Sequence, residues 1–165
     1  MGTQIKLSEP KKSDGKEIFN LINRCKPLDV NSEYLYLLQS TYFSKTCSVA
    51  KIDDKVIGFI SGYLVPNEND TLFIWQVAVD ETARGKSVAK NLLLEILNRE
   101  CNKHINYIHT TISPSNKSSQ RFFEKFATNF ETKIESSTFL EIEDFNSAHE
   151  EEVLYKIGPL KKGKK

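Results

Sequence analysis

The chain has 165 residues, of which 39% are hydrophobic and 27% charged, and this length suits a single domain with its own core. Removing the four lysines of the C-terminal KKGKK changes the formal net charge from +1 to −3. This balance excludes the basic surface typical of nucleic-acid-binding proteins.

The termini and cysteines indicate where the protein resides. The first twenty residues contain no apolar run typical of a signal peptide, and no stretch reaches the length of a membrane span. We therefore expect a cytoplasmic protein with no membrane partner. Cys25, Cys47 and Cys101 are an odd number without a CxxC pair, which predicts reduced, buried thiols. Cys101 and His104 have CxxH spacing but no second ligand pair, so no metal site is expected.

The N-terminal region predicts a strand and a helix. IKL, at residues 5–7, has the composition of a short strand. Asp14 and Glu17 have the spacing of a capping pair that opens a helix, which Pro27 ends. The expected apolar face of this helix consists of Ile18, Leu21, Ile22 and Cys25.

A second helix and three strands follow. The helix is expected within NSEYLYLLQSTYF, with Asn31 or Ser32 as its cap. Its expected apolar face consists of Tyr34, Leu37 and Leu38. Branched and aromatic residues, separated by turn-forming sequences, then predict three consecutive antiparallel strands. These strands are expected within residues 46–53, 53–65 and 71–79.

The second half continues with alternating elements. Helices are predicted from about 87 to 100 and from 116 to about 126, and strands within 106–112, 131–136 and 152–158. This order predicts a mixed α/β domain rather than a regular βαβ series. Since no linker or repeat divides the chain, we expect one domain over residues 1–160 and a disordered lysine-rich tail over 161–165.

The junction between the third of these strands and the following helix is a candidate phosphate site. Unpaired N–H groups at a helix N-terminus bind phosphate, and small residues let the backbone approach it. ARGKSVA, residues 83–89, supplies such residues at this junction. The alternative is an exposed loop with two solvated cations, Arg84 and Lys86. GxxxxGK[ST] and GxGxxG are absent, which argues against nucleotide hydrolysis and a Rossmann domain.

Taken together with the predicted order of helices and strands, this loop resembles the acyl-CoA loop of the GCN5-related N-acetyltransferases (GNAT). The family pattern is Arg or Gln, two residues, Gly, one residue, and Gly or Ala; here it is Arg84-x-x-Ser87-x-Ala89. Ser87 thus stands where the family commonly has glycine. Serine keeps the backbone N–H donor, but its Cβ disfavours a positive φ and limits close approach of the cofactor. SPSNKSSQRFFEKFA places Asn116 where the family orders the pantetheine arm of CoA, although a plain helix cap is the alternative. The resemblance implies a single GNAT-like α/β domain, whose mixed, mostly antiparallel central sheet is flanked by helices.

Four segments sharpen the resemblance. LDVNSEYLYLL, FIWQVAV, HTTISPSNKSSQRFF and HEEEVLYKI are similar, in this order, to segments of the diaminobutyrate acetyltransferases of ectoine biosynthesis. That family implies acetyl transfer from acetyl-CoA to the 4-amino group of L-2,4-diaminobutyrate, and a homodimer. The implied cofactor-binding residues are Gln76, Val77, Val79, Arg84, Gly85, Lys86, Ser87, Val88, Ala89, Asn116, Ser119 and Phe123.

Acetyl transfer also needs an N–H group that donates a hydrogen bond to the oxyanion formed by the attack. The leaving thiolate must then be protonated or leave as an anion. The family takes its oxyanion donor from the middle strand, at about Val77 here. Its usual acid, a tyrosine on the helix after Asn116, is replaced by Phe123, which has no proton to give. Tyr34 and Tyr36 are the nearest alternative acids, unless they are packed aromatics with surface hydroxyls or the thiolate leaves unassisted.

A diamino acid carries two ammonium groups, so its pocket should contain acids. The resemblance places Asp29 and Glu152 there, and makes Trp75 a pocket wall that attracts an ammonium. Asn31 and Tyr36 complete the implied substrate site. The open alternatives are a cap or turn role for Asp29, a core position for Trp75 and a solvated acid at Glu152.

His149 lies three residues before Glu152, and its imidazole is matched to proton transfer at neutral pH. It is expected to act as a base or to orient Glu152, whereas His104 and His109 are expected at the surface and in a strand. Two rival functions stay open. One is acetylation of another small amine, such as a polyamine or amino sugar. The other is a non-catalytic CoA sensor, suggested by the loss of both the loop glycine and the helix tyrosine.

Overall fold

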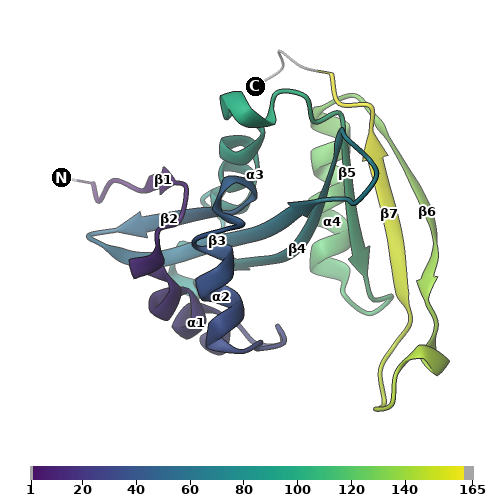
Figure 1. Ribbon diagram of the computed structural model, residues 1–165, viewed down its shortest axis with the longest axis horizontal. Coiled ribbons are helices and arrows are strands. Elements are labelled where there is room, and N and C mark those ends of the chain that lie inside the picture. The colour runs from purple at the N-terminus through teal and green to yellow at the C-terminus, as the bar shows by residue number, and fades with distance from the viewer. Residues whose placement is uncertain (1, 162–165) are drawn as a thin grey trace. The chain divides into compact units, whose positions relative to one another are not determined.

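A computed structural model describes residues 2–161 (Figure 1). Within them, seven strands form one mixed sheet in the order β1-β2-β3-β4-β5-β7-β6. The strands are β1 Lys6–Ser8, β2 Ser48–Ile52, β3 Lys55–Leu64, β4 Thr71–Val79, β5 Tyr107–Ile112, β6 Lys133–Leu140 and β7 Glu152–Gly158. The helices are α1 Gly15–Arg24, α2 Glu33–Gln39, α3 Val88–Leu97 and α4 Lys117–Asn129. Short 3-10 turns are η1 Lys12–Asp14, η2 Ser44–Thr46, η3 Glu81–Ala83, η4 Glu100–Asn102 and η5 Ile142–Asp144. The predicted order of helices and strands is confirmed.

The described chain divides into two units. The first unit comprises residues 2–63 and 74–104, and the second comprises residues 64–73 and 105–161. Strand β4 begins in the second unit and ends in the first.

The first unit is built on the antiparallel pair β2 and β3, in which Val49 lies opposite Phe59. Helices α1 and α2 lie side by side (Figure 1). The predicted apolar face of α1 is confirmed, since its four residues are at most 4% exposed. The buried cluster that they join consists of Ile18, Leu21, Ile22, Cys25, Tyr36, Cys47, Val49, Val56, Phe59 and Ala78.

The predicted cap is wrong for α1 and confirmed for α2. Asp14 precedes α1, but its carboxylate accepts the Lys11 N–H at 2.8 Å and pairs with Lys51, so the predicted capping pair with Glu17 is wrong. Ser32 caps α2: its Oγ accepts the Leu35 N–H at 3.3 Å.

The predicted apolar face of α2 is also wrong in part. Tyr34 and Leu37 are 68% and 39% exposed, whereas Tyr36 is fully buried and Gln39 is nearly so. The aromatic run YLYLL contains more apolar residues than one helical face holds, so spacing alone did not determine which tyrosine points inward.

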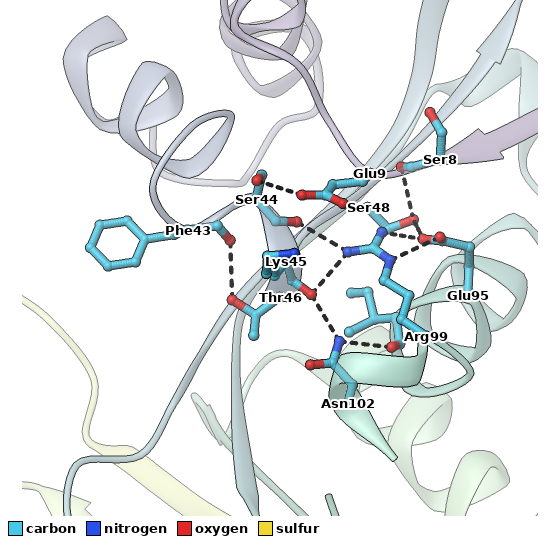
Figure 2. Close-up of polar contacts among 11 residues, drawn as sticks. Ser8, Glu9, Phe43, Ser44, Lys45, Thr46, Ser48, Glu95, Arg99 and Asn102 are labelled. Carbon is cyan, nitrogen blue, oxygen red and sulfur yellow. Dashed lines mark hydrogen bonds and ion pairs between the residues drawn. The ribbon is translucent and has the colours of Figure 1, made fainter. Parts of the chain in front are cut away.

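A polar cluster ties the segment before β2 to α3 and the turn that follows it (Figure 2). The guanidinium of Arg99 donates to the carbonyls of Ser44 and Lys45 at 3.1 and 2.9 Å and pairs with Glu95. Asn102 donates to the Lys45 carbonyl at 2.8 Å. These side-chain donors bond to carbonyls of the turn η2, just before the sheet, and so fix the start of β2.

The second unit contains β5, β7 and β6, which pair antiparallel in that order. His109 lies opposite Lys156, and Lys156 lies opposite Glu135. Helix α4 buries Phe123, Phe126 and Ala127 and contacts β6. The strands thus position the residues just before β7 and just after β5 at the same end of the β5–β7 pair.

The cysteine prediction holds for two of three residues. All three are free thiols, and Cys25 and Cys47 are buried, but Cys101 is exposed because it lies on the short turn η4. The predictions for His104, which is exposed, and His109, which lies in β5, are confirmed.

At the C-terminus, Lys161 lies 3.5 Å from Glu131, and residues 162–165 of the predicted tail lie outside the described part of the chain. No helix among residues 2–161 is long and apolar enough to cross a membrane.

Candidate active site

The loop that follows β4 is fixed at its base by Asp80. One carboxylate oxygen accepts the Thr82 N–H and hydroxyl at 3.0 and 2.7 Å, and the other accepts the Arg24 Nε–H at 2.7 Å. Arg24 also donates to the Val56 carbonyl at 3.0 Å. The hydrogen bonds from Thr82 and then from Arg24 hold the pKa of the buried Asp80 carboxyl well below its usual range. The loop therefore leaves the sheet from a fixed, ionised anchor.

Ser87 gives this loop its turn into α3. Its φ is +57° and its ψ is +24°, so a serine occupies the left-handed conformation that favours glycine. Gly85 also has a positive φ, of +78°, and a Cβ added there would meet no atom within 4 Å. The first intrahelical bond runs from Asn91 N–H to the Ser87 carbonyl at 3.0 Å, which leaves the preceding helical N–H groups without an intrahelical partner.

The remaining loop residues divide into exposed and packed positions. Arg84, Gly85 and Lys86 are exposed, and Val88 is buried. The Val79 carbonyl accepts Arg84 Nε–H at 3.4 Å and the Cys25 thiol at 3.6 Å. Burial raises the pKa of the Cys25 thiol, which keeps it protonated as this donor. Small exposed residues, free N–H groups and two cations thus coincide at the predicted phosphate site.

A second cluster joins α2 to β4. The buried Tyr36 hydroxyl donates to Gln76 Oε1 at 3.1 Å and accepts the Asn31 N–H at 3.2 Å. Gln76 Nε2 donates to the Asp29 carbonyl at 2.7 Å. Three residues predicted for the substrate, Asp29, Asn31 and Tyr36, are therefore brought together. The side chain of Gln76, predicted for the cofactor, holds their segment in place.

The side chains on the opposite face of β4 are more open. Trp75 is 46% exposed, so the alternative of a core position for Trp75 is wrong. Val77 and Val79 alternate with the buried Gln76 and Ala78, which places them on the same face as Trp75. Asp29 is also exposed, since only its backbone carbonyl is engaged.

In the second unit, Glu152 is held at the start of β7. Its Oε1 accepts the Ser113 hydroxyl at 3.1 Å and lies 3.9 Å from His149 Nε2. The His149 ring stacks on Phe145, with centroids 3.9 Å apart and an interplanar angle of 11°. Because the Glu152 side chain is only 17% exposed and accepts the Ser113 hydroxyl, the solvated-acid alternative for Glu152 is wrong.

A second contact also joins the segment after β5 to the segment before β7. Ser115 N–H donates to Glu150 Oε1 at 3.2 Å, and the Ser115 hydroxyl donates to Glu150 Oε2. Ser113, Ser115, Glu150 and Phe145 were not selected from the sequence. The serines just after β5 meet the glutamates at the start of β7 and just before it, and this can be recognised only once the pairing of the two strands is known.

Helix α4 starts at Asn116, whose Oδ1 accepts the Ser119 N–H at 3.2 Å. The helix-cap alternative is thus confirmed for Asn116, and its amide NH₂ is left free to donate among the described residues. Phe123 is 2% exposed and makes an edge contact with Phe122 at 4.9 Å. A buried phenyl ring occupies the position where the family has an acid.

The fold and the loop define an acyltransferase of the acetyltransferase (GNAT) family, and the chain belongs to this family, whose model matches residues 15–127. Relatives that match more than nine tenths of the chain at 37–48% identity share one name. The L-2,4-diaminobutyric acid acetyltransferase of Methylotuvimicrobium alcaliphilum is 48% identical over 158 residues, which cover 95% of this chain and 92% of that protein.

A comparison with solved structures gives the same family and fold. The diaminobutyrate acetyltransferase of Paenibacillus lautus, solved with L-2,4-diaminobutyric acid and coenzyme A, is 36% identical and superposes with a TM-score of 0.91 over 96% of each chain. Ard1 of Thermoplasma volcanium, at 17% identity and a TM-score of 0.72 over 93% of this chain and 97% of that one, shows the shared fold alone. The expected single GNAT-fold α/β domain is confirmed.

Proposed function

We propose that this protein transfers the acetyl group of acetyl-CoA to the 4-amino group of L-2,4-diaminobutyrate. The observation that carries the proposal is the oriented Glu152 carboxylate beside His149, in a chain 48% identical to an enzyme of that name. The Glu152 carboxylate is mostly shielded from water, which strengthens its attraction for an ammonium. Because Ser113 already orients this carboxylate, it need not be reorganised when the amine binds.

The loop from Arg84 to Ala89 suits the pyrophosphate of acetyl-CoA, which supplies an activated acetyl thioester when bound. The N–H groups at the start of α3 would donate to the phosphate oxygens, and Arg84 and Lys86 would add charge. The open space at Gly85 lets a ligand approach the backbone closely. In the second unit, the free Asn116 amide is the proposed donor to the pantetheine arm, followed on α4 by Ser119 and Phe123.

Amine activation is assigned to Glu152 and His149. An alkylammonium with a pKa near ~10 must lose a proton before it attacks the thioester. Glu152 would bind the ammonium, and His149, whose Nε2 lies 3.9 Å from the carboxylate, would take or relay the proton. The Val77 N–H is the proposed oxyanion donor by family analogy.

The remaining substrate contacts are assigned to the first unit. The exposed Asp29 carboxylate is proposed to bind the second ammonium, and the open ring of Trp75 to attract it. Tyr36 and Gln76 would act by positioning the segment that carries Asp29 and Asn31, since their polar groups bond to it. Tyr34, whose hydroxyl side is exposed, stays a candidate acid.

The test is thiol release from acetyl-CoA, measured with L-2,4-diaminobutyrate and with putrescine, with NMR of the product to assign the acetylated nitrogen. We expect a clear preference for the diamino acid and acetylation at the 4-position. Preference for putrescine would identify a polyamine acetyltransferase. If no thiol is released with either amine, the protein is a CoA-binding sensor without acetyltransferase activity.

We further propose a cytoplasmic homodimer whose acetyltransferase domain spans residues 1–160, with residues 161–165 as a tail. The dimer rests on family analogy alone. The location rests on the composition and on the similarity to the diaminobutyric acid acetyltransferases. Sedimentation measures the first, and fractionation of the source cells the second.

A further inference from the structure

The second unit contains a cavity that the proposed active site does not use. Its volume is about 400 Å³, and its lining includes His109, Glu68 and Lys156. It lies along β5 and β7 away from Glu152, because His109 pairs with Lys156 whereas the residue next to Ser113, Ile112, pairs with Val153. The cavity and the Glu152 cluster therefore occupy opposite ends of the same two strands.

His109 is the central feature of this cavity. It is only 8% exposed, yet its ring makes no hydrogen bond among the residues that the structure describes. Burial, opposed by Glu68 and assisted by Lys156, lowers the pKa of His109, so the ring is neutral at neutral pH. A neutral imidazole offers one donor and one acceptor, and both lack a partner in a space that a small molecule could enter.

The charges around the cavity sort into engaged and free groups. Asp70 accepts from Asn106 and from Thr71, both at 3.3 Å, and Glu135 pairs with Lys133 at 3.0 Å.

In contrast, Glu68 and Lys156 take part in no ion pair or side-chain hydrogen bond within the described residues. Both influence the pKa of His109, so both lie near its ring, and yet they do not pair with each other. Beside Asp70, which has neutral donors, and the Glu135–Lys133 pair, the cavity thus presents the exposed Glu68 carboxylate, the exposed Lys156 ammonium and the His109 imidazole, none of which has a side-chain partner among the described residues.

We propose that this cavity binds a small α-amino acid, with the ligand ammonium on Glu68, the ligand carboxylate on Lys156 and the His109 ring as a hydrogen-bond partner. A free cation or a free anion would satisfy only one of the two unpaired charges and would leave the other beside it. A zwitterion satisfies both, and neither the Glu135–Lys133 ion pair nor the hydrogen bonds to Asp70 need be broken. The substrate diaminobutyrate and its 4-N-acetylated product share this chemistry, so either can be the occupant.

The test is an NMR titration of the histidine rings in the full-length protein. The chain has three histidines, and each reports on a different place: His109 on the cavity, His149 on the proposed substrate site, and the exposed His104 on neither. The probes are L-2,4-diaminobutyrate, its 4-N-acetylated product, putrescine and acetate. We expect the two amino acids to shift His109 saturably, and putrescine and acetate to leave it unchanged.

Variants make the assignment specific. Glu68→Gln and Lys156→Gln should each weaken the His109 response by roughly fivefold, the scale of one exposed ion pair. Glu124→Gln and Lys125→Gln are the matched controls, because both residues are exposed on α4 and do not line the cavity. These two controls should not change the response.

The outcomes separate this inference from the proposed function. A His109 shift without a His149 shift supports the cavity and removes the proposed substrate site. A His149 shift with an unmoved His109 overturns the cavity proposal. A non-saturating shift, or an equal shift with putrescine, also overturns it, because neither is expected of a site that requires both charges.

Discussion

Asp80 and Glu152 are two inward-facing carboxylates that the molecule treats in opposite ways. Asp80 ends β4 and accepts three hydrogen bonds, two from Thr82 and one from Arg24. Glu152 starts β7 and has one hydrogen bond, from Ser113, and a longer approach to His149. The first carboxylate has its charge compensated within the protein, and the second keeps acceptor capacity for a ligand.

This difference distinguishes an anchor from a binding group. A carboxylate whose lone pairs are filled by fixed donors contributes to folding and has little left for an ammonium. A half-buried carboxylate with one neutral donor is oriented, yet still requires a cation. Asp80 is accordingly assigned to the support of the cofactor loop, and Glu152 to the amine.

The largest expected effect is that of Asp80→Asn on stability. The amide retains the shape but loses the charge that Arg24 and Thr82 recognise, so we expect the free energy of unfolding to fall by about 2 kcal/mol at pH 7. The Arg24 side chain is 35% exposed, and water will replace part of its lost contact. Urea denaturation measures the loss. Glu81→Gln, at an exposed neighbour, is the control and should change stability little.

The same pair predicts a pH dependence. The folded-state pKa of Asp80 is depressed, so its contribution is fully present above the pKa of the unfolded chain and is lost as the pH falls. The stability difference between wild type and Asp80→Asn should therefore shrink below about pH 4. A difference that stays constant from pH 7 to pH 3 would contradict the role of the ionised anchor.

Glu152→Gln should have the opposite profile, with a loss of activity and little loss of stability. Ser113 can still donate to the amide oxygen, but the amide does not attract an ammonium. We expect kcat/KM for diaminobutyrate to fall at least about tenfold, roughly 1.4 kcal/mol of transition-state stabilisation. Glu151→Gln is the matched control one residue away. Normal kcat/KM in Glu152→Gln would remove the proposed amine site.

Ser87→Gly tests the loop that Asp80 anchors. Removing the Cβ relieves the left-handed strain at φ +57° and lets the cofactor approach the backbone. We expect CoA affinity, measured by calorimetry, to rise by about fivefold, or roughly 1 kcal/mol. Ser87→Ala is the control: the Ser87 hydroxyl makes no cap bond, and alanine keeps the Cβ, so its affinity should match wild type. Equal affinity in all three proteins would place the phosphate site elsewhere.

The sequence predicted what depends on periodicity and local turns, and it missed what depends on register. The strands, the helix caps at Ser32 and Asn116, and the loop at Ser87 follow from local chemistry that nearby residues determine. Ser113 and Glu152 are 39 residues apart, and only the pairing of β5 with β7 shows that they meet.

The α2 tyrosines show the same limit within one helix. Helical spacing placed Tyr34 on the apolar face, whereas the structure exposes Tyr34 and buries Tyr36. The buried position of Tyr36 depends on Gln76, a partner 40 residues away that satisfies its hydroxyl. A buried hydroxyl needs such a partner, so the tyrosine that finds one can be buried and the other remains at the surface.

The smallest expected effect concerns the acid missing from α4. Phe123 is buried against Phe122 and has no proton to donate to the leaving thiolate. We expect Phe123→Tyr to change kcat by less than about tenfold, because the site has either recruited another acid or does not need one at this step. Phe126→Tyr, at another buried ring of the same helix, controls for the cost of a new buried hydroxyl.

A tenfold or larger gain in kcat for Phe123→Tyr would instead show that protonation of the leaving group limits the reaction, since general acids contribute about 10²–10⁴-fold. The tyrosines of α2 then complete the test. The Tyr36 hydroxyl is occupied by Gln76 and Asn31, so Tyr36→Phe should lower stability as well as activity, whereas the exposed Tyr34 has no such bond. A hundredfold loss of kcat in Tyr34→Phe with unchanged stability would therefore identify Tyr34 as the acid. Unchanged kcat in both Tyr34→Phe and Phe123→Tyr would mean that neither position 34 nor position 123 supplies an acid that the reaction needs.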